Sequence, residues 1–222
     1  MKISFSMKEL FKSGAHFGHI REKYNPKTQS FVFALREGVH LIDLEKTVIG
    51  LSKALDYMAE QKKQGKNVLF VCTKENISNI VKKTAEEIGM PYMTYRWPGG
   101  MITNFETIKK QIEKLKKLEI MVEDDQEKLI KKDKLKLNKE IKKLNQVFEG
   151  VRNMSKAPDN VFIIDTNQEK TALAEAKKKK IPIIALVDTN SDPSGIAYPI
   201  PANDDAIKGV ELILGEIKKA FK

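Results

Sequence analysis

The chain has 222 residues, 41% of them hydrophobic, which suffices to bury the core of one globular domain with an appendage. Its 40 Lys and Arg residues outnumber its 30 Asp and Glu residues, and the formal net charge of +10 favours a polyanionic partner, nucleic acid above all. No apolar run reaches the ~18–20 residues of a membrane span. The single cysteine, Cys72, excludes an intrachain disulfide and a cysteine-based zinc knuckle. We therefore expect a cytoplasmic protein without a membrane partner.

The positive charge lies in the first two thirds of the chain. Residues 1–103 carry 16 basic and 10 acidic side chains, residues 104–156 carry 15 and 10, and residues 157–222 carry 9 and 10. Arginine can fork onto phosphate, whereas lysine acts as a point charge, so the few arginines have the most weight. They are Arg21, Arg36, Arg96 and Arg152.

The N-terminal residues 1–42 predict a short helix and a β-hairpin. Ser6 and Glu9 have the spacing of a capping box, and the apolar residues that follow Ser6 indicate a helix. Phe31–Arg36 and Val39–Ile42 predict two strands around a Glu-Gly turn. The intervening residues 14–27 are expected to form neither helix nor strand.

A long amphipathic helix is predicted over Leu44–Lys63, and beyond it short apolar strands alternate with helices. The predicted strands are Val68–Val71, Tyr92–Thr94, Val161–Ile164, Ile183–Val187 and Tyr198–Ile200. The predicted helices are Asn76–Ile88, Gln168–Lys179 and Asp204–Ala220. Continuous apolar strands that alternate with helices indicate a parallel sheet covered on both faces. The expected fold is therefore a doubly wound, three-layer α/β domain.

Residues from Asn104 to Phe148 interrupt this alternation with two apolar stripes at helical spacing. A break near Glu123, Asp124 and Asp125 divides them into two helices, which we expect to form an inserted coiled-coil hairpin. At ~1.5 Å per residue its arms would reach roughly 24–36 Å. The predicted division is thus an α/β domain of residues 1–103 and 157–222, with 1–42 as its N-terminal extension, and a hairpin of residues 104–156. The lysines of the hairpin either solvate its outer face or attract phosphates.

Glycines, histidines, aromatics and cations are interleaved between Gly14 and Lys27. This composition suits a loop that lies against an RNA backbone, where rings stack and cations meet phosphates. Two alternatives remain open for the histidines. His16, His19 and His40 could bind a metal ion together, or they could simply pack inside the protein.

Two glycines follow the predicted strand at Tyr92 and precede the hairpin, within Tyr95–Phe105. Backbone amides in such a turn could approach a phosphate. The sequence contains neither of the glycine patterns typical of nucleotide-binding loops. We therefore expect a rigid turn that starts the hairpin and carries Arg96 and Trp97 on its surface.

Acidic side chains follow the last two predicted strands, at the edge where open α/β sheets bind their ligands. They are Asp188, Asp192, Asp204 and Asp205. Four carboxylates could hold a divalent cation, but Asx turns and helix capping explain the same residues, and we favour this structural interpretation. Cys72 lies in or beside an apolar strand, where a cysteine is usually inert. No nucleophile is paired with a base, so the sequence predicts no catalytic site.

Five motifs, taken in order, resemble the bacterial-type small-subunit ribosomal protein S2 family. They are His16–His19, Asn25–Lys27, Val39–Thr47, Arg96–Asn104, and Val187–Pro193 with Pro201–Ile207. The resemblance implies a flavodoxin-like domain with a protruding coiled-coil hairpin, and no catalysis. It also implies binding to small-subunit ribosomal RNA late in assembly, and help in docking the large messenger-binding ribosomal protein. The expected location is the cytoplasmic ribosome, with an organelle ribosome as the alternative.

The resemblance, together with neighbouring cations, selects candidates for an RNA-facing surface. These are His16, His19, Arg21, Lys23, Tyr24, Asn25, Lys27, Arg36, Arg96, Trp97, Asn104, Lys109 and Lys110. Pro98 stands where the family commonly has leucine, and Glu149 stands where it has glycine, at the exit of the hairpin. Two other functions stay open at this stage: a nucleotide- or metal-binding enzyme on a flavodoxin-like scaffold, and a hairpin that docks a protein.

Overall fold

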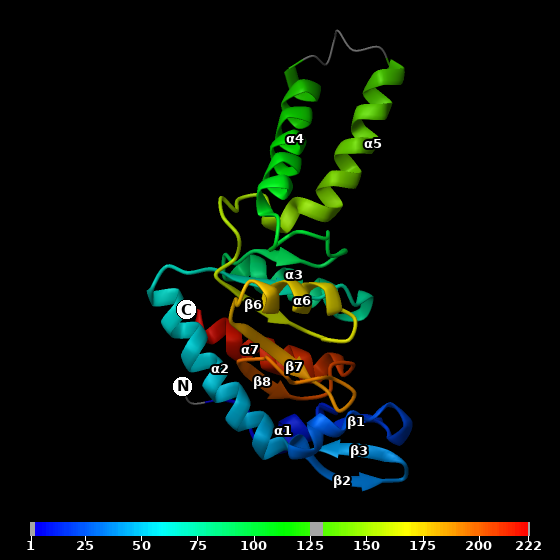
Figure 1. The fold of residues 1–222 in the computed structure, drawn as a ribbon, viewed down its shortest axis with the longest axis vertical. Helices are drawn as coiled ribbons and strands as arrows, with labels where there is room; N and C mark the ends of the chain where they lie inside the picture. Colours follow the sequence, from blue (N-terminus) through cyan, green and yellow to red (C-terminus); the bar gives the residue numbers. More distant parts are fainter. Residues whose placement is uncertain (1–2, 125–130, 222) are drawn as a thin grey trace.

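A parallel β-sheet organises the computed structural model, which describes residues 3–124 and 131–221 (Figure 1). Within these ranges the sheet has five strands: β4 (Val68–Val71), β5 (Tyr92–Met93), β6 (Asn160–Ile163), β7 (Ile183–Val187) and β8 (Tyr198–Pro201). They lie in the order β5-β4-β6-β7-β8, and every neighbouring pair is parallel. Counted along the chain this is the order 2-1-3-4-5, which is typical of flavodoxin-like domains. The predicted fold class is confirmed.

The strands are buried on both faces, and their side chains alternate between two cores. Phe70 and Phe162 point into the first core, which is covered by α2 (Leu44–Lys63), α3 (Glu75–Glu87) and α7 (Ile207–Ala220). Val71 and Ile163 point into the second, which is covered by α6 (Lys170–Lys178) and by the base of the hairpin. In the described part of the chain, no helix combines the length and the apolarity needed to cross a bilayer.

Two predicted helices begin later than expected because Asx turns precede them: Asp165 forms the turn before α6, and Asn203, whose Oδ1 accepts from the amide of Asp205 at 2.9 Å, forms the turn before α7. Asp165 adopts a φ of +62°, and its side chain accepts hydrogen bonds from the amides of Asn167 and Gln168. This Asx turn delays the start of α6 to Lys170. The last helix likewise begins at Ile207 rather than at Asp204.

The N-terminal residues form a separate antiparallel sheet. The capping box of Ser6 and Glu9 is confirmed at α1 (Met7–Lys12), and β2 (Val32–Arg36) and β3 (Val39–Ile42) form the predicted hairpin. The expectation that residues 14–27 lack a strand is wrong, because β1 (Phe17–Ile20) pairs with β3. Among the described residues this sheet therefore has three strands, in the order β1-β3-β2, with short 3-10 helices at residues 21–23 and 26–31 between β1 and β2.

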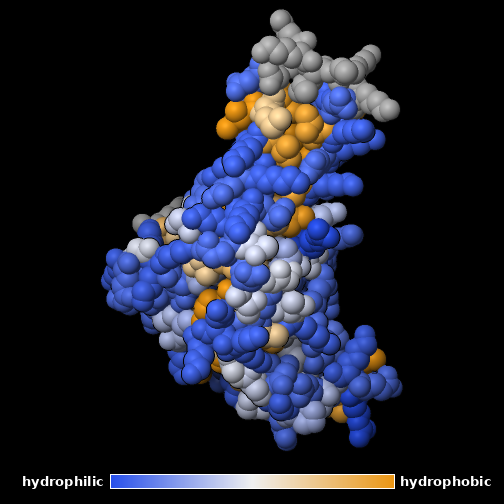
Figure 2. Space-filling model, turned by 45° about the horizontal axis from the view of Figure 1, so that its top comes forward, coloured by the Kyte–Doolittle hydropathy of each residue, from blue (hydrophilic) through white to orange (hydrophobic). Residues whose placement is uncertain are grey.

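The predicted helical hairpin consists of α4 (Phe105–Asp124) and α5 (Lys131–Phe148), which project from the domain at the end opposite β1, β2 and β3 (Figure 1). The base of α4 is rooted in the second core through residues such as Ile108 and Leu115. Farther out, Ile120 and Leu135 are 55% and 58% exposed, and Figure 2 shows apolar side chains gathered toward the far end of the hairpin. The break between the two helices is predicted near Glu123, Asp124 and Asp125, and Asp125 lies outside the described residues.

The chain leaves α5 through a short 3-10 helix, Glu149–Val151. Glu149 is exposed and pairs with Lys82 at 2.7 Å, so a side chain is accommodated at this position. The next residue, Gly150, carries the constraint instead, because a Cβ there would lie 2.3 Å from the carbonyl oxygen of Tyr92. The glycine that the exit requires is therefore present one residue later.

Candidate nucleic-acid interface

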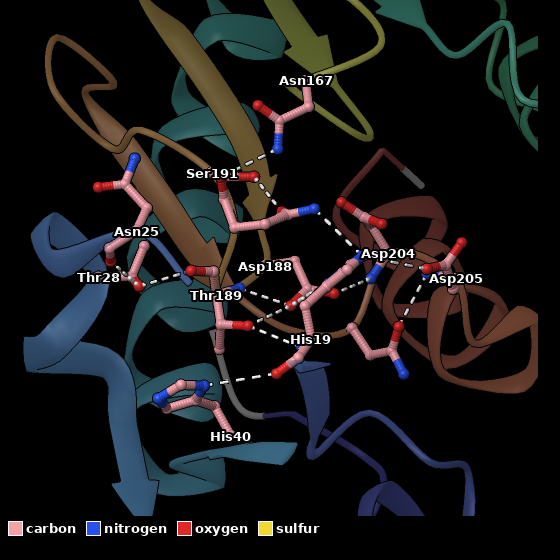
Figure 3. A network of polar contacts seen from close by, with 12 residues as sticks. His19, Asn25, Thr28, His40, Asn167, Asp188, Thr189, Ser191, Asp204 and Asp205 are labelled. Carbon is pink, nitrogen blue, oxygen red and sulfur yellow. Dashed lines mark hydrogen bonds and ion pairs between the residues drawn. The ribbon is translucent and has the colours of Figure 1, made fainter. Parts of the chain in front are cut away.

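The N-terminal sheet is attached to the carboxyl end of β7 by a set of hydrogen bonds around Thr189 (Figure 3). The amide of His19 donates to Thr189 Oγ1 at 2.8 Å, and the amide of Asn25 donates to the Thr189 carbonyl at 2.8 Å. The Thr28 hydroxyl donates to the same carbonyl at 3.0 Å. Gly18 permits this approach, because a Cβ there would lie 2.5 Å from the Thr189 side chain. The loop predicted to face RNA is thus fixed to the parallel sheet.

His19 belongs to this attachment rather than to the open surface. Its side chain is 18% exposed, and its Nδ1 lies 3.2 Å from the fully buried carboxylate of Asp188. Its Nε2 lies 3.7 Å from Asp205. The Asp188 carboxylate raises the pKa of His19 above its ordinary value, although burial acts in the opposite direction. When His19 is protonated, its ion pair with Asp188 helps to hold β1 against the loop that follows β7.

The other two histidines have separate packing roles. His16 is buried, stacks on Phe11 at a ring distance of 4.1 Å and packs against the tilted ring of Phe17 at 4.0 Å, and burial lowers its pKa. His40 stacks on Tyr24 at 4.1 Å. In the described ranges no cluster of three or more His, Cys, Asp or Glu residues is placed to hold a metal ion. Each histidine instead has its own aromatic or carboxylate neighbour.

A lysine occupies the crevice where a flavodoxin-like sheet would bind a ligand. Lys74 follows β4 and Asp165 follows β6, the two strands where the strand order reverses. The Lys74 ammonium lies 3.0 Å from Asp165, 3.1 Å from Asp204 and 2.5 Å from Asp205. Burial opposes the charge of Lys74, but the surrounding carboxylates outweigh it and raise its pKa.

The candidate cation site is therefore already neutralised from within the chain. Burial, assisted by the negative charges of Asp165 and Asp188, raises the pKa of Asp204 to about 7. Asp192 lies apart from this group, where it pairs with Lys27 at 2.7 Å and has its pKa lowered by that hydrogen bond. The ion pairs of Lys74 join the loops that follow β4, β6 and β8, and the pair of His19 with Asp188 joins β1 to the loop that follows β7.

The Trp-Pro-Gly-Gly turn before α4 does cradle an anion, but the anion is a side chain of the protein. The buried carboxylate of Glu175 on α6 accepts hydrogen bonds from the indole of Trp97 at 3.0 Å and from the amide of Gly100 at 2.7 Å. It also accepts from the amide of Ile102 and from the amide and hydroxyl of Thr103, at 2.9–3.0 Å. Burial opposes the charge of Glu175, but these donors outweigh it and lower its pKa.

The sequence-derived RNA candidates fall into three classes of exposure. The exposed ones are Arg21, Lys23, Lys27, Arg36, Arg96, Asn104 and Lys110. The half-buried ones are His19, Tyr24, Asn25, Trp97 and Lys109, whereas His16 is buried. Figure 1 places β1, β2 and β3 at one end of the molecule and the hairpin at the other, so the candidates form two separate groups. Sequence reasoning missed Lys74 and Glu175, the two residues that occupy the expected ligand positions.

Comparison with known proteins agrees with this architecture. Residues 10–222 match the family described as Ribosomal protein S2. The chain is 46% identical over 216 residues to the small ribosomal subunit protein uS2 of Dictyoglomus thermophilum, a match that covers 97% of this chain and 88% of that protein. It is 44% identical over 217 residues to the proteins of the same name from Helicobacter acinonychis and Helicobacter pylori, covering 88% and 82% of them. The fold, the motifs and these matches together establish that the chain belongs to the ribosomal protein S2 family.

Proposed function

We propose that this chain is a structural component of the small ribosomal subunit and binds its ribosomal RNA. The observation that carries the proposal is the similarity, over 97% of the chain, to proteins named small ribosomal subunit protein uS2. The S2 family consists of structural ribosomal components, not of enzymes. The interpretation as a nucleotide- or metal-binding enzyme is therefore dropped.

Two cationic groups supply the RNA contacts in this proposal. Arg21, Lys23 and Arg36 form the N-terminal surface, beside β1 and β2, and all three are exposed. Arg96 and Lys110 lie near the base of the hairpin, together with Asn104 and Lys109. Such side chains contact phosphates and fix orientation, while the shape of the RNA supplies most of the selectivity. His16, His19, Asn25 and Trp97 support these surfaces from within.

The proposal includes a role in assembly. We infer that residues 104–156 act as an inserted unit on the domain formed by residues 1–103 and 157–222. The protein joins a cytoplasmic small subunit late, beside other small-subunit proteins, and helps to dock the large messenger-binding ribosomal protein. The exposed Ile120, Met121 and Leu135 toward the end of the hairpin favour a protein contact there, because RNA backbones offer no apolar surface.

Sedimentation tests the ribosomal assignment. The chain is expressed with an affinity tag in its native cell, and the lysate is run through sucrose gradients in low and moderate salt. We expect comigration with the small subunit that persists into moderate salt. If the chain instead stays at the top of the gradient as a free 25.2 kDa species in both salts, the assignment is wrong.

A hairpin variant separates RNA binding from protein docking. Ile120→Ser with Met121→Ser removes exposed apolar surface from α4 without removing charge. We expect these subunits to retain the chain but to carry less of the messenger-binding protein, measured by quantitative mass spectrometry of the gradient peak. Lys117→Ser on the same helix is the control. Unchanged occupancy of the messenger-binding protein would contradict the docking role.

A further inference from the structure

In the C-terminal third of the chain, acidic and basic side chains lie at opposite edges of the parallel sheet. Residues 157–222 carry 9 basic and 10 acidic side chains, which suggests an electrically neutral segment. The structure places Asp165, Asp188, Asp204 and Asp205 at the carboxyl edge of the parallel sheet. Lys177–Lys180 lie at the opposite, amino edge, where α6 ends before β7 begins. A near-neutral segment therefore contributes a compact positive group to one face.

Strand register brings a second lysine group to the same edge. Val68 of β4 is paired with Asn160 of β6, and Val161 of β6 is paired with Ile183 of β7. Lys66 precedes Asn67, whose amide donates to the Asp159 side chain. Lys180 lies two residues before Pro182, whose carbonyl accepts from the amide of Val161. Both lysines therefore lie near the start of β6. Strands β4 and β7 are two strand spacings apart, or about 10 Å. Lys63, at the end of α2, leads directly into this corner.

We name the exposed side chains of this corner the amino-edge lysines: Lys63, Lys66, Lys178, Lys179 and Lys180. Within residues 3–124 and 131–221 none of them lies within ion-pair distance of a carboxylate. The nearby acid Asp159 is already paired with Lys156 at 2.7 Å. Although burial acts in the opposite direction, the charge of Lys66 also lowers the pKa of Asp159, so Lys66 and Lys156 share one carboxylate, and the surface keeps a positive excess.

Favourable interaction with the helix dipole explains some of the lysines at the end of α6 but not all of them. Lysines in the last turn of a helix stabilise its negative end, and Lys177 and Lys178 occupy that turn of α6. Lys179 and Lys180 lie beyond it. Four adjacent positive charges also repel one another, so the run is larger than helix capping needs.

Lys180 also stands where the backbone favours glycine. Three helices end at this edge with the same pair of hydrogen bonds. One amide donates to the carbonyl five residues before it, as in Ile181 to Ala176, and the preceding amide donates to the carbonyl three residues before it, as in Lys180 to Lys177. The left-handed residue is Gly65 after α2 and Gly89 after α3, with φ of +67° and +68°. After α6 it is Lys180, with φ of +55°. A lysine is strained there, whereas glycine is not.

We propose that the amino-edge lysines form a further binding surface for the sugar-phosphate backbone of ribosomal RNA. Lys180 has a strained backbone and lies among other positive charges. Binding of a polyanion to these lysines would explain why the residue is a lysine and not a glycine. The large exposed apolar residues of the described chain all lie elsewhere, and lysine is depleted at the centres of protein interfaces, so an acidic protein fits less well. The inference rests on the proposed function and adds a contact surface to it.

The test uses small subunits from the native cell from which this chain has been stripped by salt washing. Tagged variants are added back, and the bound fraction is measured by sedimentation over a series of salt concentrations. For Lys178→Ser, Lys179→Ser and Lys180→Ser combined, we expect at least about tenfold weaker binding at ~0.1 M salt and a log–log salt slope smaller by about 2. The matched control, Lys53→Ser, Lys83→Ser and Lys208→Ser, removes the same charge from other faces and is expected to bind within about twofold of the unmodified chain.

Lys180→Gly separates a binding role from a structural one. Because glycine relieves the strained backbone, this variant is expected to melt at a higher temperature than the unmodified chain and yet to bind the stripped subunits several-fold more weakly. Higher melting with unchanged affinity, or equal losses in the triple variant and its control, overturns the inference while the proposed function stands. If the unmodified chain fails to rebind at all, both are overturned.

Discussion

Gly18 shows how one missing side chain allows two sheets to meet. Its position under Thr189 leaves no room for a methyl group, since a Cβ would lie 2.5 Å from Thr189 Cγ2 and 2.9 Å from the His40 carbonyl oxygen. The Thr189 hydroxyl accepts from the His19 amide, and His40 lies in β3, which is paired with a strand on each side, so neither neighbour can move away freely. The identity of residue 18 therefore controls how the N-terminal surface is attached.

Gly18→Ala is expected to lower the free energy of unfolding by about 1–3 kcal/mol, because the added methyl overpacks the contact with Thr189. Urea unfolding followed by circular dichroism measures the change. Gly99→Ala is the matched control, since a Cβ at Gly99 would meet nothing within 4 Å. Its effect should stay within about 0.5 kcal/mol. Equal effects of the two variants would show that the contact is not tight.

Glu175→Gln is expected to destabilise the turn that starts the hairpin by about 2–3 kcal/mol, because charged hydrogen bonds are lost and an amide group must face donors. Trp97 is the only tryptophan of the chain, and its indole donates to Glu175, so its fluorescence emission should shift to longer wavelength. Glu211→Gln, at an exposed position on α7, controls for the charge change. An unshifted emission spectrum would contradict the cradle.

At the scale of elements, the attachment of β1 depends on pH through His19. Its pKa is raised in the folded chain, so protonated His19 stabilises the fold fully below about pH 6.5 and loses that contribution as pH rises through the folded pKa. Burial lowers the pKa of His16, so His16 does not gain a proton between about pH 6.5 and 8.5 and does not contribute to this pH dependence. Asp204, with its pKa raised to about 7, also loses stabilisation as pH rises, in both the unmodified chain and a His19 variant.

The unmodified chain should therefore be less stable at about pH 8.5 than at about pH 6.5. His19→Gln should reduce this difference, because the variant has no proton to lose at that position. Urea midpoints measured at both pH values test the expectation. A difference of the same size in the variant would show that His19 does not carry it.

The two halves of α4 are expected to respond differently to truncation. Leu115 is fully buried at the root of the hairpin, whereas Ile120 is 55% exposed. Leu115→Ala should cost about 2–5 kcal/mol by leaving a cavity, and Ile120→Ala should cost less than about 1 kcal/mol. Chemical denaturation of both variants compares them directly. Similar costs would mean that the described root does not share the domain core.

At the scale of the whole molecule, cations lie at several separate places on the surface. Arg21→Ala with Arg36→Ala, on the N-terminal surface, is expected to weaken rebinding to stripped subunits and to reduce the log–log salt slope by about 1–2. Lys53→Ser with Lys83→Ser, which removes the same charge elsewhere, serves as the control. A slope unchanged by the arginine variant would remove the N-terminal surface from the proposal.

The sequence predicts the doubly wound sheet and the hairpin well because both depend on local periodicity. Leu44–Lys63 is predicted with the bounds that α2 has. β1 escapes prediction because Phe17–Ile20 is short and contains a glycine, and only its pairing with β3 makes it a strand. Glu175 escapes because its partners Trp97 and Gly100 lie 78 and 75 residues away. Contacts of this range leave no periodic signal along the chain.

The RNA candidates come from the family motifs and neighbouring cations, and their surroundings in the fold divide them. Arginines on the N-terminal surface are exposed, as their chemistry suggests. His16 and His19 are held by rings and carboxylates that come from other elements, such as Phe11 and Asp188. Sequence indicates which side chains are suited to RNA, but not which of them the fold has already paired.

The hydrogen bond between His19 and Thr189 spans 170 positions of the chain. A ribosome adds roughly 5–20 residues each second, so β1 waits on the order of 10–30 s for the residue that will hold it. During that time the N-terminal arginines lie on a segment that is not yet joined to the parallel sheet. The newly made chain consequently gains its oriented N-terminal surface only after Thr189 has been synthesised, so readiness for assembly depends on a segment made long after β1 itself.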